Sequence, residues 1–330
     1  MRRPDSFSLA MLSVIAIASI APPSAGILHT LSPLATAAVA LLFFVHGASL
    51  ARDAVLAGIG QWRLHLFVLG ITFLGFPLLL VPLTHLPLPN VPDALVLGFL
   101  YLAVLPSAVS SSIAFTAMAG GNVPAAICSA ALSSVFGLML TPLLLTVLVG
   151  HRQSFPIAQA LIHIVWELLL PFVAGQLCCP LLRSLLEARP AIKPRVDQGV
   201  ILLIVYLAFA NAMRNGIWHD LPSWMIVATV VFCAAVLGLA FSVTTWLSRR
   251  LGFSRDNEIA AVFCGSKKSL ASGLPMAKVL FAGNPALGLI VLPIMCYNQL
   301  QILIGPLIAQ RYARRHARLR NDEAAEAGNP

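Results

Sequence analysis

Long apolar stretches recur along the whole chain and constrain its fold more than any other feature. They are separated by short polar breaks or breaks rich in Pro and Gly, and lie near residues 7–25, 33–51, 64–84, 94–118, 122–149, 157–180, 198–214, 224–247, 257–281 and 286–309. An α-helix needs about 20 apolar residues to cross roughly 30 Å of hydrocarbon. The sequence therefore predicts an all-α integral membrane protein of about ten transmembrane helices.

The composition argues against a soluble fold of this length. Apolar residues make up 59% of the chain and charged residues 10%, whereas a soluble domain has about 45 to 50% and about 25%. The net charge of +9 does not indicate a nucleic-acid partner, because the basic residues lie in short loops and the tail. All six cysteines lie within apolar stretches without metal-ligand spacing, so we interpret them as buried hydrophobes rather than disulfides.

The distribution of basic residues predicts the orientation in the membrane, since Lys and Arg gather in short cytoplasmic loops. With both termini in the cytoplasm, 16 of the 21 basic residues lie inside, Arg152 and Arg214 lie outside, and three lie within the ninth stretch. The stretch 7–20 resembles a signal peptide, but more apolar stretches follow without a soluble domain, so we expect it to be the first span. We predict a multi-pass protein of the plasma membrane, the bacterial inner membrane, with both termini cytoplasmic.

A weak internal repeat divides the chain into halves. Ala119–Ala125 resembles Ala282–Ala286, and Asn122 and Asn284 are 162 positions apart in a chain of 330. Five spans per half would invert the second copy in the membrane, as in many transporters. A match this short also arises by chance. The expected organisation is two inverted five-helix repeats and a cytoplasmic polar tail, at residues 1–150, 151–310 and 311–330.

Two of the apolar stretches carry polar, helix-breaking segments in mid-span. The fourth contains Leu105-Pro106-Ser107-Ala108-Val109-Ser110-Ser111-Ser112, and the ninth contains Phe263-Cys264-Gly265-Ser266-Lys267-Lys268-Ser269-Leu270-Ala271-Ser272-Gly273. Unsatisfied backbone groups cost several kcal/mol each in hydrocarbon, so a broken helix is tolerated only where protein or a water-lined cavity receives them. Two breaks at matching positions of two repeats predict a solute site between them, with half-helix N-termini available to an anion.

Lys267 and Lys268 are the strongest functional signal, because a lysine at mid-membrane costs about 2.5 to 3.5 kcal/mol on insertion scales. In a functional interpretation they bind an anionic solute or take up and release a coupling proton. In a structural interpretation, one caps the carbonyls of the broken helix and the other pairs with an acid. Glu167 in the sixth stretch, near His163, is either their counter-ion or a proton relay, or a residue with a structural hydrogen bond or a misassigned loop position. His46 and Gln301 are expected to hydrogen-bond between helices.

Enzyme chemistry has weaker support in the sequence. Gly265-Ser266-Lys267-Lys268-Ser269 resembles part of a phosphate-binding loop, but the earlier glycine of that pattern is absent. A serine and a neutral lysine could form an intramembrane hydrolase nucleophile and base, yet no companion oxyanion motif is present. We therefore expect no enzyme activity.

At the two breaks and beyond, the sequence resembles the bile acid:sodium symporter family, especially its bacterial symporter-like branch related to the seventh human member. The resembling segments are Leu64-His65-Leu66-Phe67, Phe76-Pro77, Val109-Ser110-Ser111, Gly120-Gly121-Asn122, Ala125-Ala126-Ile127, Thr141-Pro142, Phe263-Cys264, Lys268-Ser269-Leu270, Gly273, Pro275-Met276 and Phe281-Ala282-Gly283. The resemblance implies ten helices in a panel domain and a core domain, with helices four and nine broken and crossing in the core.

The resemblance also implies a departure from the sodium sites of well-studied relatives. The sodium-binding Glu of the ninth helix falls at Phe263, the following Gln at Lys267, and two hydroxyl ligands of the fifth helix at Ala126 and Ala130. Of the implied ligands, the serines of the fourth helix keep their oxygens. A hard cation needs several oxygens. The candidate coupling ions are therefore sodium and a proton. We expect protonation of a lysine to take the place of a sodium ion.

Together these observations predict a secondary transporter of a small organic, anionic solute, working by alternating access. The alternative is a non-transporting membrane sensor or regulator with the same fold. Membrane lipid is the expected surrounding; solute identity and oligomeric state are not encoded in these patterns. The candidate solute- and ion-binding residues are Ser110, Ser111, Ser112, Asn122, Glu167, Gly265, Ser266, Lys267, Lys268 and Ser269.

Overall fold

The computed structural model describes residues 6–49, 58, 60–84, 91–149, 162–189, 191–216 and 222–327. Over these residues the chain forms helices and no strands. The helices are α1 (Ser6–Ile20), α2 (Ala25–Ala48), α4 (Trp62–Gly70), η1 (Ile71–Gly75), α5 (Phe76–Leu80), η2 (Val81–Thr84), α6 (Asp93–Val104), α7 (Val109–Met118), α8 (Val123–Val149), η4 (Val165–Leu169), α10 (Leu170–Ala188), α11 (Ile192–Arg214), α12 (Ser223–Arg250), α13 (Arg255–Gly265), α14 (Leu270–Leu280) and α15 (Leu287–Ala327).

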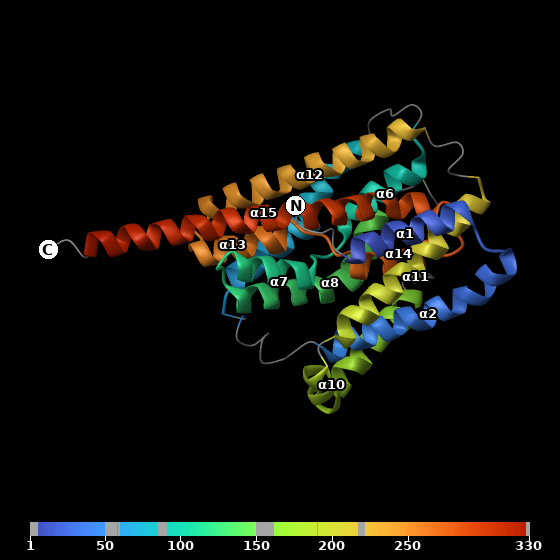
Figure 1. Ribbon diagram of the computed structural model, residues 1–330, viewed down its shortest axis with the longest axis horizontal. Helices are drawn as coiled ribbons and strands as arrows, with labels where there is room; N and C mark the ends of the chain where they lie inside the picture. Colours follow the sequence, from blue (N-terminus) through green and yellow to red (C-terminus); the bar gives the residue numbers. More distant parts are fainter. Residues whose placement is uncertain are drawn as a thin grey trace.

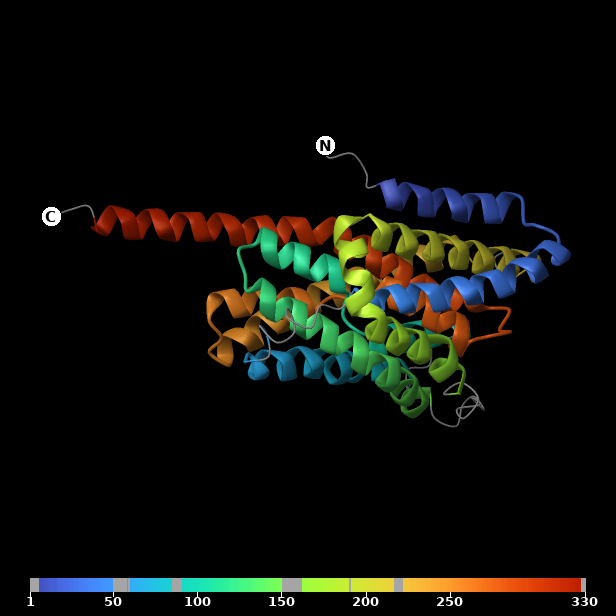
Figure 2. The same cartoon turned by 90° about the horizontal axis from the view of Figure 1, so that it is seen from below.

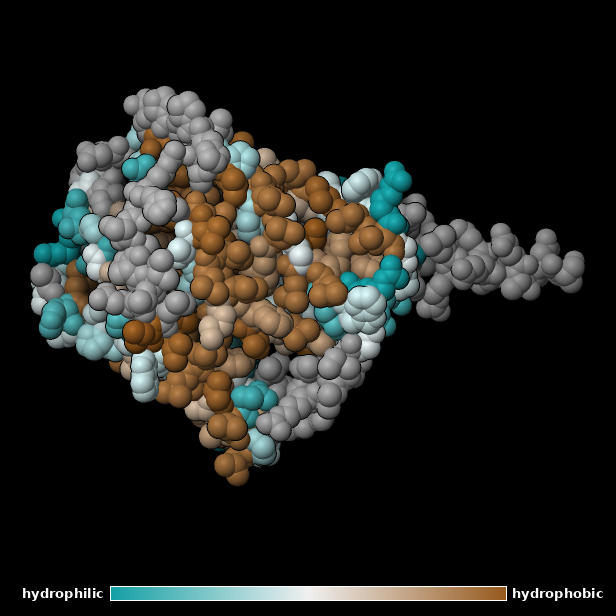
Figure 3. Space-filling view, turned by 180° about the vertical axis from the view of Figure 1, so that it is seen from behind, coloured by the Kyte–Doolittle hydropathy of each residue, from teal (hydrophilic) through white to brown (hydrophobic). Residues whose placement is uncertain are grey.

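The helices have the length and composition of a multi-pass membrane protein. Among the described residues seven are long and apolar enough to cross a membrane, and the bent pair α6 and α7 makes eight. Figure 3 shows apolar residues gathered in a broad band across one face, with hydrophilic residues toward its two ends. The all-helical membrane fold is thus confirmed, while the count of ten spans stays a prediction. Arg152 and residues 157–161 of the sixth expected span lie outside the described residues.

Two helices are interrupted, both inside the segments that the sequence predicts to be broken. α6 ends at Val104 and α7 begins at Val109, at an angle of 56°, because Pro106 has no backbone N–H to continue a helix. α13 ends at Gly265 and α14 begins at Leu270. Ser269 caps α14, its hydroxyl accepting a hydrogen bond from the backbone N–H of Ser272 at 3.1 Å.

The helices pack in two groups that meet along α11. In the first group, α2 packs against α10 and α11, and α1 packs against α11. In the second group α6, α7, α8, α12, α13 and α15 surround the two interruptions, and α11 joins the groups by packing against α14 and α15. Figures 1 and 2 show the first group to one side of the second, and α15 continuing past the other helices to the C-terminus.

Glycines bring α2 and α10 into close contact. A Cβ placed on Gly47 would overlap the carbonyl oxygen of Phe172, and one on Gly175 would overlap the carbonyl oxygen of Phe44. Small residues let membrane helices approach backbone to backbone, where van der Waals packing replaces the hydrophobic driving force. The first group is therefore held together by direct helix contact.

The two segments of the predicted repeat have similar local structure. Gly120 follows α7 with φ of 75°, and Gly283 follows α14 with φ of 76°, a left-handed conformation that glycine adopts without strain. The side-chain oxygen of Asn122 then accepts a hydrogen bond from Ala125 N, three residues on, and that of Asn284 accepts one from Ala286 N, two residues on. The sequence match thus places a left-handed glycine and a capping asparagine after each interrupted helix.

Candidate functional site

The two interruptions contact each other directly in the middle of the second group. The backbone N–H of Ser269 donates to the carbonyl oxygen of Pro106 at 2.9 Å, so the second break supplies a donor to the first. In the other direction, the hydroxyl of Ser112 donates to the carbonyl oxygen of Phe263 at 2.8 Å. Backbone groups freed by one break are therefore satisfied by the other, as a helix broken inside a membrane requires.

Polar side chains of α15 satisfy more of the exposed backbone at the second break. The hydroxyl of Tyr297 donates to the carbonyl oxygen of Ser266 at 2.7 Å. Gln301 bonds both backbone groups of Lys268, accepting from its N–H at 3.1 Å and donating to its carbonyl at 3.0 Å. This is the interhelical role expected of Gln301. Side chains of α15 therefore satisfy backbone groups at this break.

Lys268 takes the structural role that the sequence left open for one of the two lysines. Its ammonium donates to three carbonyl oxygens, those of Ala103 and Leu105 at 2.8 Å each and of Thr72 at 2.9 Å. The first two are carbonyls left free where α6 ends. The ammonium also lies 4.1 Å from the ring centroid of Phe76. Lys268 is thus a completely buried cap of the broken helix.

Lys267 differs from its neighbour although it is equally buried. Its ammonium lies 3.6 Å from the ring centroid of Phe115 in α7 and makes no hydrogen bond within the described part of the chain. The structural interpretation expected an acid partner here, and the described residues place none against it. A buried ammonium with one aromatic face as its contact is costly, which is the usual mark of a group kept for function.

A cavity of about 470 Å³ opens next to the two breaks, between the two groups of helices. One wall holds the N-terminal turns of α7 and α14, with Ser110, Ser111 and Ser269 facing the cavity. Phe43 and Phe172 belong to the opposite wall, built by α2, α10 and α11. The N-termini of two helices, with their partial positive charges, therefore face one space, an arrangement suited to an anion.

Charged side chains of the first group add to this cavity. His46 of α2 lies 3.2 Å from Asp197 of α11, joining Nε2 to Oδ1, and Lys193 lines the same wall. Lys193 and Asp197 precede the apolar stretch at 198–214, and the structure includes both in the first turns of α11. A basic and an acidic residue at the start of a span could have indicated a cavity entrance.

The remaining candidate residues lie elsewhere. Gly265 at the end of α13 and Ser266, Lys267 and Lys268 of the second break are buried and do not line the cavity. Asn122 caps α8 and donates from its side-chain nitrogen to the side-chain oxygen of Asn257 at 2.9 Å.

Glu167 lies in η4 with its Oε1 at 3.2 Å from His163 Nδ1. Both residues line a second cavity of about 510 Å³, together with Lys278. The ammonium of Lys278 bonds the carbonyl of Ser32 at 3.2 Å and the hydroxyl of Thr36 at 2.6 Å, joining α14 to α2.

The hydrolase alternative gains no support from this geometry. The hydroxyl of Ser266 donates to the carbonyl of Val262 at 2.6 Å, and that of Ser269 donates to Ser272 at 3.2 Å. Within the described residues, neither Lys267 nor Lys268 has a hydrogen bond to a serine hydroxyl.

Two interrupted helices that meet beside a cavity in an all-helical membrane protein are an architecture typical of membrane transporters. The comparison with known families agrees, and names the particular family. The chain belongs to the SBF-like CPA transporter family, whose model matches residues 5–314.

Related proteins match over nearly the full length. The chain is 46% identical over 323 residues to a protein of Pseudomonas aeruginosa described as uncharacterised, covering 98% of this chain and 96% of that one. It is 42% identical to the putative symporter YfeH of Escherichia coli, over 98% and 97%. It is 32% identical to sodium/bile acid cotransporter 7 of Xenopus tropicalis, over 93% and 91%. The expected family is therefore confirmed, and it indicates a membrane transporter rather than the sensor or enzyme alternatives.

Proposed function

We propose that this protein moves a small organic anion across the inner membrane by alternating access, with the second group of helices moving as a core against the first group as a panel. The cavity bounded by the N-termini of α7 and α14 is the observation that carries the proposal. The acidic group of the solute binds near Ser110, Ser111 and Ser269. Its apolar body packs on the opposite wall, against Phe43 and Phe172.

The positions of the two cavities support alternating access. Along α2, Ser32 and Thr36 line the second cavity while Phe43 and His46 line the first. α11 and α14 are divided in the same way, with their N-terminal parts on the first cavity and their C-terminal parts on the second. Two cavities at opposite ends of one interface are what a rocking transporter needs.

The proposed topology has ten spans with both termini cytoplasmic, so that the first cavity faces inward. It adds α1 and the interrupted pair α13 and α14 to the eight spans that length and composition identify. α1 has 15 residues, and the pair carries Lys267 and Lys268 where a purely apolar helix would not. Lys267 and Lys268 are both buried in the bundle rather than facing lipid, which supports counting α13 and α14 together as one span.

We further propose that the charge of Lys267 replaces a coupling sodium ion, which leaves a proton as the coupling ion. The positions that the family resemblance assigns to sodium ligands offer the ring of Phe263, the Lys267 ammonium and the methyl groups of Ala126 and Ala130. Ser112 uses its hydroxyl to bond Phe263. A hard cation finds too few oxygens in this set.

Reconstitution into liposomes tests the proposal. Vesicles that contain the purified protein are given carboxylates and sulfonates of graded size. Uptake of each solute is compared with uptake by protein-free vesicles. Ser110→Leu and Ser111→Leu fill the cavity wall and are expected to reduce uptake at least tenfold, because a blocked site loses most of its binding energy. Ser13→Ala, on an exposed face of α1, is the matched control and keeps uptake. Uptake that is unchanged in both leucine variants contradicts the site.

A further inference from the structure

A groove of about 540 Å³ runs along the outer surface of α12, closed on one side by Ile308 of α15. α12 and α15 lie side by side in this region (Figure 1). The groove is lined by Phe241, Ser242 and Thr245, and one end carries Trp246 with the two arginines of the last turn of α12. Phe241 and Ile308 thus form an apolar channel, beside the hydroxyls of Ser242 and Thr245, that leads to a basic end.

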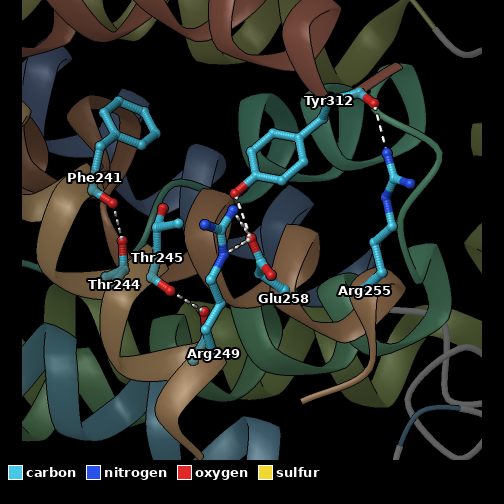
Figure 4. Close-up of polar contacts among 8 residues, drawn as sticks. Phe241, Thr244, Thr245, Arg249, Arg255, Glu258 and Tyr312 are labelled. Carbon is cyan, nitrogen blue, oxygen red and sulfur yellow. Dashed lines mark hydrogen bonds and ion pairs between the residues drawn. The ribbon is translucent and has the colours of Figure 1, made fainter. Parts of the chain in front are cut away.

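The two arginines at that end differ in how they are engaged. Arg249 donates through Nε and Nη2 to Oε1 of Glu258 at 3.0 and 2.9 Å, and the hydroxyl of Tyr312 donates to the same oxygen at 2.8 Å. Figure 4 shows these three side chains pointing toward one another from α12, α13 and α15. Arg250 is exposed, and its guanidinium lies 5.5 Å from the ring centroid of Trp246. Its charge is therefore available to a ligand.

The surroundings of the groove are those of a surface in lipid. Exposed apolar side chains flank it on both helices, including Leu239 and Val243 of α12 and Leu303 and Leu307 of α15. From Leu239 to Arg250 the helix rises about 16 Å, roughly half of the hydrocarbon thickness. Trp246 and Arg250 then stand where aromatic and basic residues gather at the membrane surface.

We propose that this groove binds one anionic phospholipid, with the phosphate at Arg250 and an acyl chain along Phe241 and Ile308. A guanidinium forms paired hydrogen bonds to phosphate oxygens, and a net negative headgroup complements the excess positive charge at this end. The apolar channel selects a lipid over a free phosphate, because a soluble anion makes no use of it. The site is separate from the solute cavity and does not depend on transport.

Native mass spectrometry of the purified full chain in detergent tests the site. The protein is titrated with phosphatidylglycerol and, separately, with phosphatidylcholine, and bound lipid is counted. The wild type is expected to bind phosphatidylglycerol more tightly. Arg250→Ala is expected to weaken that binding about fivefold, the usual effect of removing one basic group near an anionic lipid. Arg195→Ala, an exposed arginine of α11 away from the groove, is the matched control and stays within about twofold.

Three results would overturn the proposal. They are equal affinity of the wild type for the two lipids, an equal loss in the Arg195 and Arg250 variants, and displacement of phosphatidylglycerol by inorganic phosphate. The last result assigns the site to a soluble anion. Ile308→Trp, which fills the apolar channel, is expected to weaken binding of both lipids. The wild-type comparisons can overturn the proposal even if a variant folds poorly, and the variants assign the binding to this groove.

Discussion

Lys267 and Lys268 are adjacent and equally buried, yet the structure predicts a large loss of stability when Lys268 is replaced by methionine and almost none when Lys267 is. Methionine keeps the length and apolar packing of the side chain and removes the charge. In Lys268→Met, the carbonyl oxygens of Thr72, Ala103 and Leu105 lose their shared donor. In Lys267→Met the change removes an ammonium whose described contact is the Phe115 ring.

The magnitudes separate the two variants. A buried carbonyl left without its donor costs about 1 to 3 kcal/mol, so three cost about 3 to 9 kcal/mol. Relief from burying the lysine's own charge offsets part of this and leaves a net loss of about 3 to 5 kcal/mol. We expect a loss of that size for Lys268→Met. The cation–π contact of Lys267 contributes about 0.5 to 2 kcal/mol, which relief from burying an unpaired ammonium offsets. We expect almost no net change for Lys267→Met.

Thermal unfolding in detergent measures the difference. Taking about 2 °C per kcal/mol for a long chain, the melting temperature of Lys268→Met falls by about 6 to 10 °C and that of Lys267→Met moves by less than about 2 °C. In liposomes Lys267→Met is expected to stay folded and lose uptake, which distinguishes a functional charge from a structural one. Equal destabilisation by both substitutions, or a neutral Lys268→Met, would refute the division of roles.

Four further outcomes are expected. Gly175→Val separates α2 from α10 and lowers folded yield, measured by size-exclusion chromatography, because its side chain overlaps the Phe44 carbonyl. Tyr297→Phe leaves the Ser266 carbonyl unpaired and costs about 1 to 3 kcal/mol in thermal unfolding. Replacing potassium in the buffer by sodium at fixed pH is expected to leave the melting temperature and the uptake rate unchanged. A rise of either quantity with sodium would refute the proposal that the charge of Lys267 replaces a sodium ion. Lys278→Met removes the bridge from α14 to α2, and thiol labelling of a cysteine introduced in the second cavity is expected to accelerate about fivefold.

The sequence predicts the breaks because their signals are local. Pro106 cannot donate the hydrogen bond that an unbroken helix needs, and two adjacent lysines cannot lie in a helix that faces lipid. Asn122 and Asn284 likewise indicate the turns that follow α7 and α14. Each of these features is encoded within a few residues of the structure it produces.

The roles of individual site residues depend on partners far away in the chain, which no local pattern encodes. The carbonyl of Thr72, in a π-helical turn, is 196 positions from Lys268. His46 was expected to join helices, and its partner Asp197 comes from another helix and lines the cavity. The pattern therefore identifies two unusual lysines but cannot tell which one caps the break and which one keeps its charge unpaired.

The hydrogen-bond partners of the two breaks indicate which interface between helices could move in the proposed transport cycle. The hydrogen bonds of Lys268 join it to Thr72 of η1, to Ala103 and Leu105 at the end of α6, and to Gln301 of α15. None of them reaches α1, α2, α10 or α11, the first group of helices. Breaking these bonds would expose several buried carbonyls at once, so any change of conformation has to carry the two breaks together as one unit. The interface with the first group is different, since cavities of about 470 and 510 Å³ occupy its two ends and Lys278 bridges it near one of them. Movement there would break few polar contacts, so this interface is where the proposed transport cycle would move the second group against the first.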